Sequence, residues 1–325
     1  MKRNSKIILT SVIILTLIVI GIFGLSRLRS LKSPASIIST TFPGYDFARA
    51  VTGNSTKLKM LVSPGTEIHN FEPTPQDIID INNSDLFIYI GGESDEWVER
   101  LLENNEIPTD KTLRLMDIIK PLEEEHVEGM EEEHDHDHHE DEHDEHEDHA
   151  EYDEHIWTSP VNAAKIVEAI KDKLTEIYPS DAALYQKNAE AYINRLFSID
   201  YQIRDLVNNS NKKKLIFGDR FPFRYFTNEY GLDYFAAFPG CSEQTEASSS
   251  TVAFLIDKVK ADDIKVVFKI ELTDGKLANT IAEAAGAKVL ELNSAHNISL
   301  SDFDSGLTYA DIMEQNLKVL EEALK

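Results

Sequence analysis

Histidine is distributed unevenly along this 325-residue chain, and its placement is the first chemical signal in the sequence. Residues 131–149 read EEEHDHDHHEDEHDEHEDH and contain only glutamate, aspartate and histidine. Imidazole and carboxylate groups bind divalent metals, but a flexible chain loses conformational entropy when it does so. The tract is therefore expected to offer several weak metal sites rather than one tight site. Eight of the eleven histidines lie in it or just before it: His126, His134, His136, His138, His139, His143, His146 and His149.

The other three histidines lie where the chain is expected to leave a strand or enter a helix. His69 lies in PGTEIHNFEPTPQD, His155 in DEHIWTSP and His296 in ELNSAHN. Cys241, the only cysteine, lies in FPGCSEQTEAS just past a predicted strand. Open α/β sheets bind ligands beyond the carboxyl ends of their strands, so these four side chains are candidates for one site.

Three imidazoles and one thiolate would form a closed four-coordinate shell that suits zinc. Such ligands favour zinc over manganese or calcium, which prefer oxygen, while copper and nickel remain chemically compatible. Cys241 also has a simpler interpretation as a small buried hydrophobic residue. Because it is the only cysteine, no intramolecular disulfide is expected.

Strand-like and helix-like segments alternate in both halves of the chain, which predicts an α/β fold with two parallel-sheet sandwich lobes. Residues 180–207 contain no glycine or proline and repeat apolar side chains every three or four positions, as a long helix does. Ser159 and Pro160 predict the start of the preceding helix. The predicted organisation is an N-terminal segment 1–35, a lobe 36–178, a rigid connecting helix 179–211 and a second lobe 212–325.

The negative charge is local. The formal net charge is −26, and residues 123–154 contribute −19 of it through 19 acidic and no basic side chains. Nucleic-acid binding needs a basic face and is not expected. Residues 123–154 form an insertion before the helix at Pro160, and its dense like charge predicts disorder without metal.

The N-terminus contains an apolar run of 18 residues, 7–24, flanked by basic residues on both sides. Its length lies between that of a signal-peptide core and that of a membrane helix. An uncleaved membrane anchor is favoured over a cleaved signal, and no cysteine follows the run to carry a lipid. In either case the remainder is expected outside the cytoplasm, at the cell surface or in the periplasm.

Residues 36–325 resemble the metal-binding solute-binding proteins of ABC importers, specifically the zinc branch of the zinc/manganese cluster. PGTEIHNFEPTPQDI is similar to the first ligand motif of that family, with His69 as ligand, and DEHIWTSPVNA to the second, with His155. A His-rich insertion between these motifs and a long helix between two lobes are also typical. The resemblance implies a monomer that delivers Zn²⁺ to a permease and its ATPase and catalyses nothing.

The later motifs depart from that pattern. FGDRFPFRYFTNEYGLDY resembles the third motif, but Gly218 stands where zinc-binding members carry a histidine. Cys241 is the predicted replacement and His296 the predicted fourth ligand. The alternative ligands or supporting residues are Asp219, Glu243, Glu246 and Glu271.

Three other functions stay open at the level of sequence. A shell richer in carboxylates would indicate manganese transport. A metal buffer or adhesin without a transporter would have the same site. A zinc enzyme would need an open coordination position and a general base such as Glu67 or Glu271, and no HExxH motif occurs in the chain.

Overall fold

The computed structural model describes residues 36–53, 56–66, 68, 71–104, 106–130, 152–242, 244 and 246–325. The predicted N-terminal anchor at residues 7–24 lies outside this part of the chain. The described part also excludes His69, Glu67 and Glu243. It excludes every histidine of the tract, whereas His126, just before the tract, is described. In the part that is described, no helix has the length and apolar character needed to cross a membrane.

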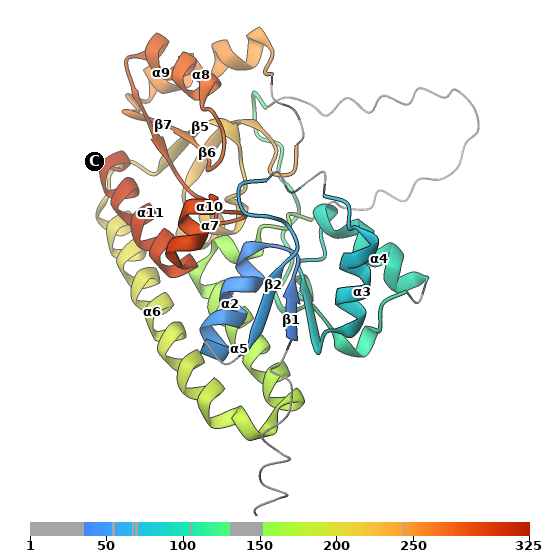
Figure 1. The fold of residues 1–325 in the computed structure, drawn as a ribbon. Coiled ribbons are helices and arrows are strands. Elements are labelled where there is room, and N and C mark those ends of the chain that lie inside the picture. The colour runs from blue at the N-terminus through green and yellow to red at the C-terminus, as the bar shows by residue number, and fades with distance from the viewer. Residues whose placement is uncertain are drawn as a thin grey trace, which may run out of the picture. The chain divides into compact units, whose positions relative to one another are not determined.

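Two four-stranded sheets, both entirely parallel, organise the described chain (Figure 1). The first has the order β2-β1-β3-β4 and the second β6-β5-β7-β8, which confirms the predicted fold class. The strands are β1 (Ser36–Ser39), β2 (Lys57–Met60), β3 (Leu86–Tyr89), β4 (Thr112–Arg114), β5 (Lys214–Arg220), β6 (Asp233–Phe238), β7 (Val266–Lys269) and β8 (Lys288–Glu291).

Helices connect the strands and cover both sheets. Those of the first half are α2 (Phe42–Thr52), α3 (Pro75–Asn83), α4 (Glu96–Glu103) and α5 (Pro160–Ile177). The long helix α6 (Ala182–Asn209) leads to α7 (Arg224–Tyr230), α8 (Ser249–Ala261), α9 (Lys276–Ala285), α10 (Leu300–Ser305) and α11 (Tyr309–Ala323). Short 3₁₀ turns include η2 (Glu93–Asp95), η5 (Ile156–Thr158) and η6 (Pro179–Asp181).

The alternation of side chains along each strand divides the core into layers. In β3, Leu86 and Ile88 face a large core shared with α2, α5 and α6, whereas Phe87 and Tyr89 face a separate cluster that includes Trp97 of α4. The strands of the second sheet also contribute one face to the large core and the other to a cluster with α8 and α9. One continuous core therefore joins the inner faces of both sheets.

The predicted long helix is present and starts after a 3₁₀ turn. α6 has 28 residues, and Leu196, Ile199 and Ile203 point into the core as their spacing predicts. The Ser159 hydroxyl caps α5 by accepting the Asn162 N–H, also as predicted. The helix α11, which our sequence analysis did not predict, packs on α2 and α6 (Figure 1). The end of the chain thus returns to the first half.

A buried carboxylate joins these three helices. The Oδ2 atom of Asp46 on α2 accepts the Tyr192 hydroxyl of α6 at 2.7 Å and the Tyr309 N–H of α11 at 2.9 Å. Arg49 pairs with the same carboxylate and donates to the Leu307 carbonyl at 2.7 Å. Burial raises the pKa of Asp46, while Arg49 and the hydrogen bonds oppose that rise.

A second buried carboxylate shapes the loop after β3. The Oδ2 atom of Asp95 accepts the N–H groups of Ile90 at 2.6 Å and Gly91 at 3.3 Å, and the Thr40 hydroxyl at 3.3 Å. Burial, together with the negative charge of Glu154, raises the pKa of Asp95 to about 7. The loop that leaves the carboxyl end of β3 is therefore fixed by an acid that is only partly ionised at neutral pH.

The Asp46 network is expected to carry a measurable part of the stability. Asp46→Ala leaves the Tyr192 hydroxyl and the Tyr309 N–H without their acceptor, so the free energy of unfolding should fall by about 2–4 kcal/mol. Urea denaturation measures the change, and Glu190→Ala on the exposed face of α6 is the control. A loss for Asp46→Ala no larger than that of the control would contradict this role.

Asp95 gives a pH dependence with a defined sign. Because its pKa is raised in the folded state, folded protein holds a proton that unfolded chain has released, so stability falls as pH rises from about 4 to about 7. Asp95→Asn stays neutral, and its Oδ1 atom can accept the same three hydrogen bonds. The variant should be about 2–4 kcal/mol more stable than the wild type at pH 8 and similar at pH 4.

Urea denaturation of metal-free protein at both pH values measures this effect. Asp110→Asn, which changes an exposed acid of the same half, is the matched control. An unchanged pH slope in Asp95→Asn would show that this carboxyl group does not titrate as described.

Candidate metal centre

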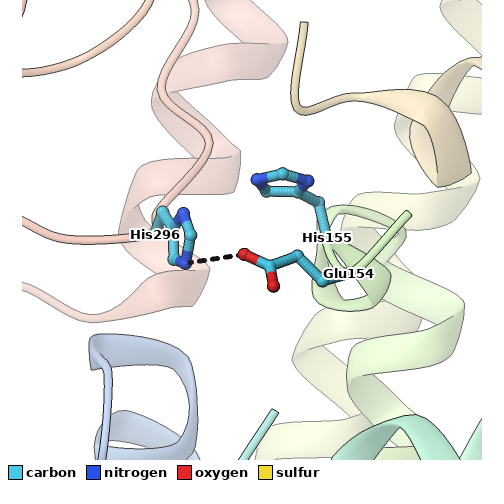
Figure 2. Close-up of side chains that lie close together, drawn as sticks. All are labelled: Glu154, His155 and His296. Atoms are coloured by element: carbon cyan, nitrogen blue, oxygen red, sulfur yellow. Dashed lines mark ion pairs between the residues drawn. The ribbon is translucent and has the colours of Figure 1, made fainter. Parts of the chain in front are cut away.

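Three buried side chains from the two halves of the described chain meet at one point. Glu154, His155 and His296 each offer a ligand atom, and these atoms all lie within 4.8 Å of one another. The Nε2 atom of His296 lies 3.9 Å from Oε1 of Glu154. Figure 2 shows His296 approaching from a loop of the second half and the other two from the segment before α5. One carboxylate and two imidazoles at this separation can surround a divalent cation.

Glu154 is fixed from the first half. Its carboxylate accepts the Ser94 N–H at 3.0 Å and also the Ser94 hydroxyl, both from η2 in the loop after β3. Both hydrogen bonds come from a 3₁₀ turn held by the buried Asp95. A carboxylate with donors on one side keeps lone pairs available on the other, toward His296.

His155 is oriented by its neighbour Asp153. Oδ1 of Asp153 accepts the backbone N–H of His155 at 2.8 Å and lies 3.3 Å from Nδ1 of the ring. With Nδ1–H directed at this carboxylate, Nε2 keeps its lone pair for a metal. The Thr158 hydroxyl donates to the His155 carbonyl at 2.8 Å and closes the turn that precedes α5.

His296 lies in a strained loop that a buried carboxylate supports. Glu271, just past β7, accepts the Ser294 N–H at 2.8 Å, the Ser294 hydroxyl at 2.5 Å and the His296 N–H at 3.2 Å. Ala295 between them has φ +60°, which costs a residue with a side chain about 1 kcal/mol. Glu271 thus offsets the strain and fixes the backbone that presents His296.

Trp157 forms the back wall of the centre. Its ring lies 4.8 Å from the ring of His296 and 5.5 Å from that of His155. The indole N–H donates to the Ser294 carbonyl at 2.8 Å, and the Tyr309 hydroxyl of α11 donates to the Trp157 carbonyl at 2.6 Å. The indole therefore connects the His155 segment directly to the His296 loop.

A small cavity adjoins the two histidines. Its volume of about 50 Å³ is far below the ~300 Å³ at which pockets begin to hold organic ligands, so its size suits an ion. Thr66 and Ile68 line it together with His155 and His296. Both residues belong to the loop after β2, whose motif contains His69.

The loop after β2 is tied to the loop that carries His296. The side-chain amide of Asn297 donates to the carbonyls of Ser63 and Thr66, both at 2.9 Å. The Gly65 N–H also donates to the Ile298 carbonyl at 2.8 Å. Two of the predicted ligand motifs are therefore fastened together.

Burial and neighbouring charges shift the pKa of both Glu154 and His155. Burial raises the pKa of Glu154, and the hydrogen bonds from Ser94 counteract only part of that rise. Burial acts to lower the pKa of His155, but the carboxylates of Asp153, Glu154 and Glu124 outweigh it and raise the pKa. Because both groups hold a proton more strongly than usual, a cation that binds here competes with protons, and its binding depends on pH.

Cys241 is not a member of this group in the described residues. It is buried and lines a different hollow with Glu93, Glu96 and Tyr152. Burial and the charge of Glu154 raise the pKa of its thiol well above the usual value. The thiol therefore keeps its proton at neutral pH unless a cation replaces it.

Two of the alternative acids, Asp219 and Glu271, hold backbone segments near the site. Asp219 accepts the Thr273 hydroxyl at 2.7 Å, the Arg220 N–H at 2.9 Å and the Ile270 N–H at 3.3 Å, which ties β5 to the loop after β7. Glu246 is exposed and outside the group. Glu271 supports the His296 loop from behind, as its predicted supporting role implies.

Position 218 has no room for the histidine that the third motif carries there in zinc-binding members. A Cβ atom there would lie 2.5 Å from Cα of Ala278 on α9, and real Cβ atoms do not approach a backbone so closely. The glycine lets β5 and α9 pack against each other, so a histidine at this position would not fit the packing of this structure.

Sequence reasoning missed Glu154 as a potential ligand. It directly precedes His155, but it is the last of the 19 acidic residues in 123–154, and the composition alone does not distinguish it from the others. Its side chain is completely buried in the structure. The available signal was its place next to the predicted ligand, at the point where the acidic tract meets a predicted helix.

Comparison with known proteins places this chain in a family. The family described as "Zinc-uptake complex component A periplasmic" matches residues 37–323. The high-affinity zinc uptake system protein ZnuA of Bacillus subtilis is 33% identical over 291 residues, which cover 89% of this chain and 87% of ZnuA. The zinc-binding lipoprotein AdcA of Streptococcus pneumoniae is 32% identical over 312 residues, which cover 96% of this chain but only 60% of AdcA.

A solved structure agrees with these matches. The Zn(II)-bound ZnuA-like domain of Streptococcus pneumoniae AdcA superposes with a TM-score of 0.71 at 28% identity, over 90% of this chain and 99% of that domain. Proteins of this family bind solutes and are not enzymes. The chain belongs to the ZnuA family of zinc-binding solute-binding proteins of ABC uptake systems.

Proposed function

We propose that this protein captures Zn²⁺ outside the cytoplasm and delivers it to an ABC permease and its ATPase. The observation that carries the proposal is the buried convergence of Glu154, His155 and His296 beside a cavity sized for an ion. Relatives named for zinc binding and zinc uptake support the choice of metal. The protein would act as a monomer, anchored by residues 7–24.

The ligand set that we propose is His69, His155 and His296 with Glu154 as the fourth ligand. His69 is assigned from its motif, because the loop around it borders the same cavity. Cys241, which the sequence predicts as the replacement for the missing third ligand, is the alternative to Glu154. Imidazole donors favour zinc over manganese, and one carboxylate is an ordinary member of a zinc shell.

Delivery rather than catalysis follows from a shell made entirely of protein ligands, which leaves no position for a reacting water. We also propose that residues 36–178 and 212–325 act as two lobes connected by the helix within 179–211. Helix α6 and the shared core resist a wide hinge motion, so release would proceed through small movements of the ligand loops.

The ligand set is tested by removing one donor at a time from the full chain. Glu154→Gln and His296→Ala should each weaken zinc binding by about 100-fold or more in competition with a chelator, because each removes one donor from a four-member shell. Glu96→Gln, which removes an exposed acid of the same half, is the control. An unchanged affinity in either ligand variant would refute the proposed site.

X-ray absorption on zinc-loaded Cys241→Ser separates the two candidate fourth ligands. With Glu154 as ligand, the shell contains only nitrogen and oxygen and is the same in wild type and variant. A sulfur atom near ~2.3 Å that is lost in the variant would instead identify Cys241. Preferential loading of Mn²⁺ over Zn²⁺ by the wild type would favour the manganese alternative.

The tract between residues 131 and 151 is proposed to gather zinc at weak sites and pass it to the tight site. Replacing it by a short Gly-Ser linker should lower the number of zinc ions bound per chain and leave one tight site. Calorimetric titration of both proteins measures stoichiometry and affinity together. Loss of tight binding in the shortened protein would contradict a purely auxiliary role.

A further inference from the structure

The first residues of the acidic insertion lie against the second half of the described chain. We call Leu122–Met130 the strap. The Leu122 N–H donates to the Tyr225 hydroxyl of α7 at 3.0 Å, and Glu125 pairs with Arg224 at 3.1 Å. Further contacts come from β6 and α8: Tyr234 donates to Glu125 at 3.2 Å, Lys258 pairs with Glu128 at 3.3 Å, and Thr251 donates to the Gly129 carbonyl at 2.8 Å.

The start of the strap lies beside the segment that leads back to the metal centre. Glu123 and Tyr152 form an antiparallel bridge, and the Asp153 N–H donates to the Leu122 carbonyl at 3.0 Å. The Tyr225 hydroxyl donates to the Asp153 carbonyl at 2.9 Å while it accepts from Leu122. One tyrosine of the second half therefore holds both the start of the strap and the residue that orients His155.

Glu124 makes the contact nearest to the centre. Its Oε1 atom accepts the backbone N–H of Gly240 at 2.9 Å. Gly240 lies close against the imidazole of His155, because a Cβ atom at this position would be 3.1 Å from Cε1 of that ring. Gly240 follows β6, so this loop approaches His155 from the second half.

We infer that the strap positions part of the metal centre. Glu124 is the positioning residue, and it holds the loop at Gly240 against His155. The consequence for metal binding rests on the proposed function: a loop held against one ligand restricts the movement of that ligand and the path by which zinc leaves. Glu124 acts through Gly240 and need not touch the metal.

A rival explanation is purely electrostatic, because Glu124 is also one of the carboxylates near His155. The two explanations differ in what glutamine does. Glu124→Gln removes the charge but keeps a side-chain oxygen that accepts the Gly240 N–H, whereas Glu124→Ala removes both. Glu128→Ala removes a charge from the same strap, but this side chain is exposed and pairs with Lys258 of α8 rather than with Gly240.

The experiment compares these three variants with the wild type in the full chain. One readout is the rate of zinc release to a chelator, and the other is hydrogen exchange of the Gly240 amide in metal-free protein. Glu124→Ala should release zinc about tenfold faster or more and exchange the Gly240 amide faster, because a hydrogen bond to a charged group is lost. Glu124→Gln should be close to the wild type in both, and Glu128→Ala unchanged.

Equal effects of the alanine and glutamine variants would overturn the inference in favour of the charge. Unchanged Gly240 exchange in Glu124→Ala would also overturn it, because the loop would then not depend on the strap. The exchange measurement needs no metal. If the wild type bound no zinc, the proposed function would fail, and the exchange comparison would still decide whether Glu124 holds the loop.

Discussion

The arrangement of the two halves depends on one buried carboxylate. Asp46 accepts hydrogen bonds from α6 and α11, so the first helix of the described chain, its longest helix and its last helix are fixed to one another. The same α11 residue that donates its N–H to Asp46 donates its hydroxyl to Trp157. A change at Asp46 would thus alter the position of Trp157 through a single residue, Tyr309.

In the candidate metal centre, His155 and His296 are each placed by a carboxylate outside the group that they form with Glu154. Asp153 fixes His155, and Glu271 fixes the strained backbone that carries His296. Buried carboxylates are costly unless hydrogen-bonded, and here the donors are backbone and serine groups of the ligand loops. The cost of burying these acids is offset by bonds that also define the geometry of the site.

Much of this was predictable because parallel sheets impose strong patterns. Strand–helix alternation predicted both sheets, and glycine-free periodicity predicted α6. His155 and His296 were predicted from their place after strands or before a helix, and the structure brings them together. Glu154 was hidden by its acidic surroundings, and α11 was missed because nothing local in its sequence shows where it packs. Both depend on tertiary burial, which a local pattern does not contain.

Because Glu123 and Tyr152 form a bridge, the length of the insertion between them can change without changing the geometry of the fold. Because the chain leaves and returns at adjacent backbone positions, residues added beyond the strap do not have to span any distance. Lengthening such a loop is entropically inexpensive, since each doubling costs only about 0.6 kcal/mol. Gain or loss of histidines and acids between these two bridge positions is therefore expected to have little effect on folding.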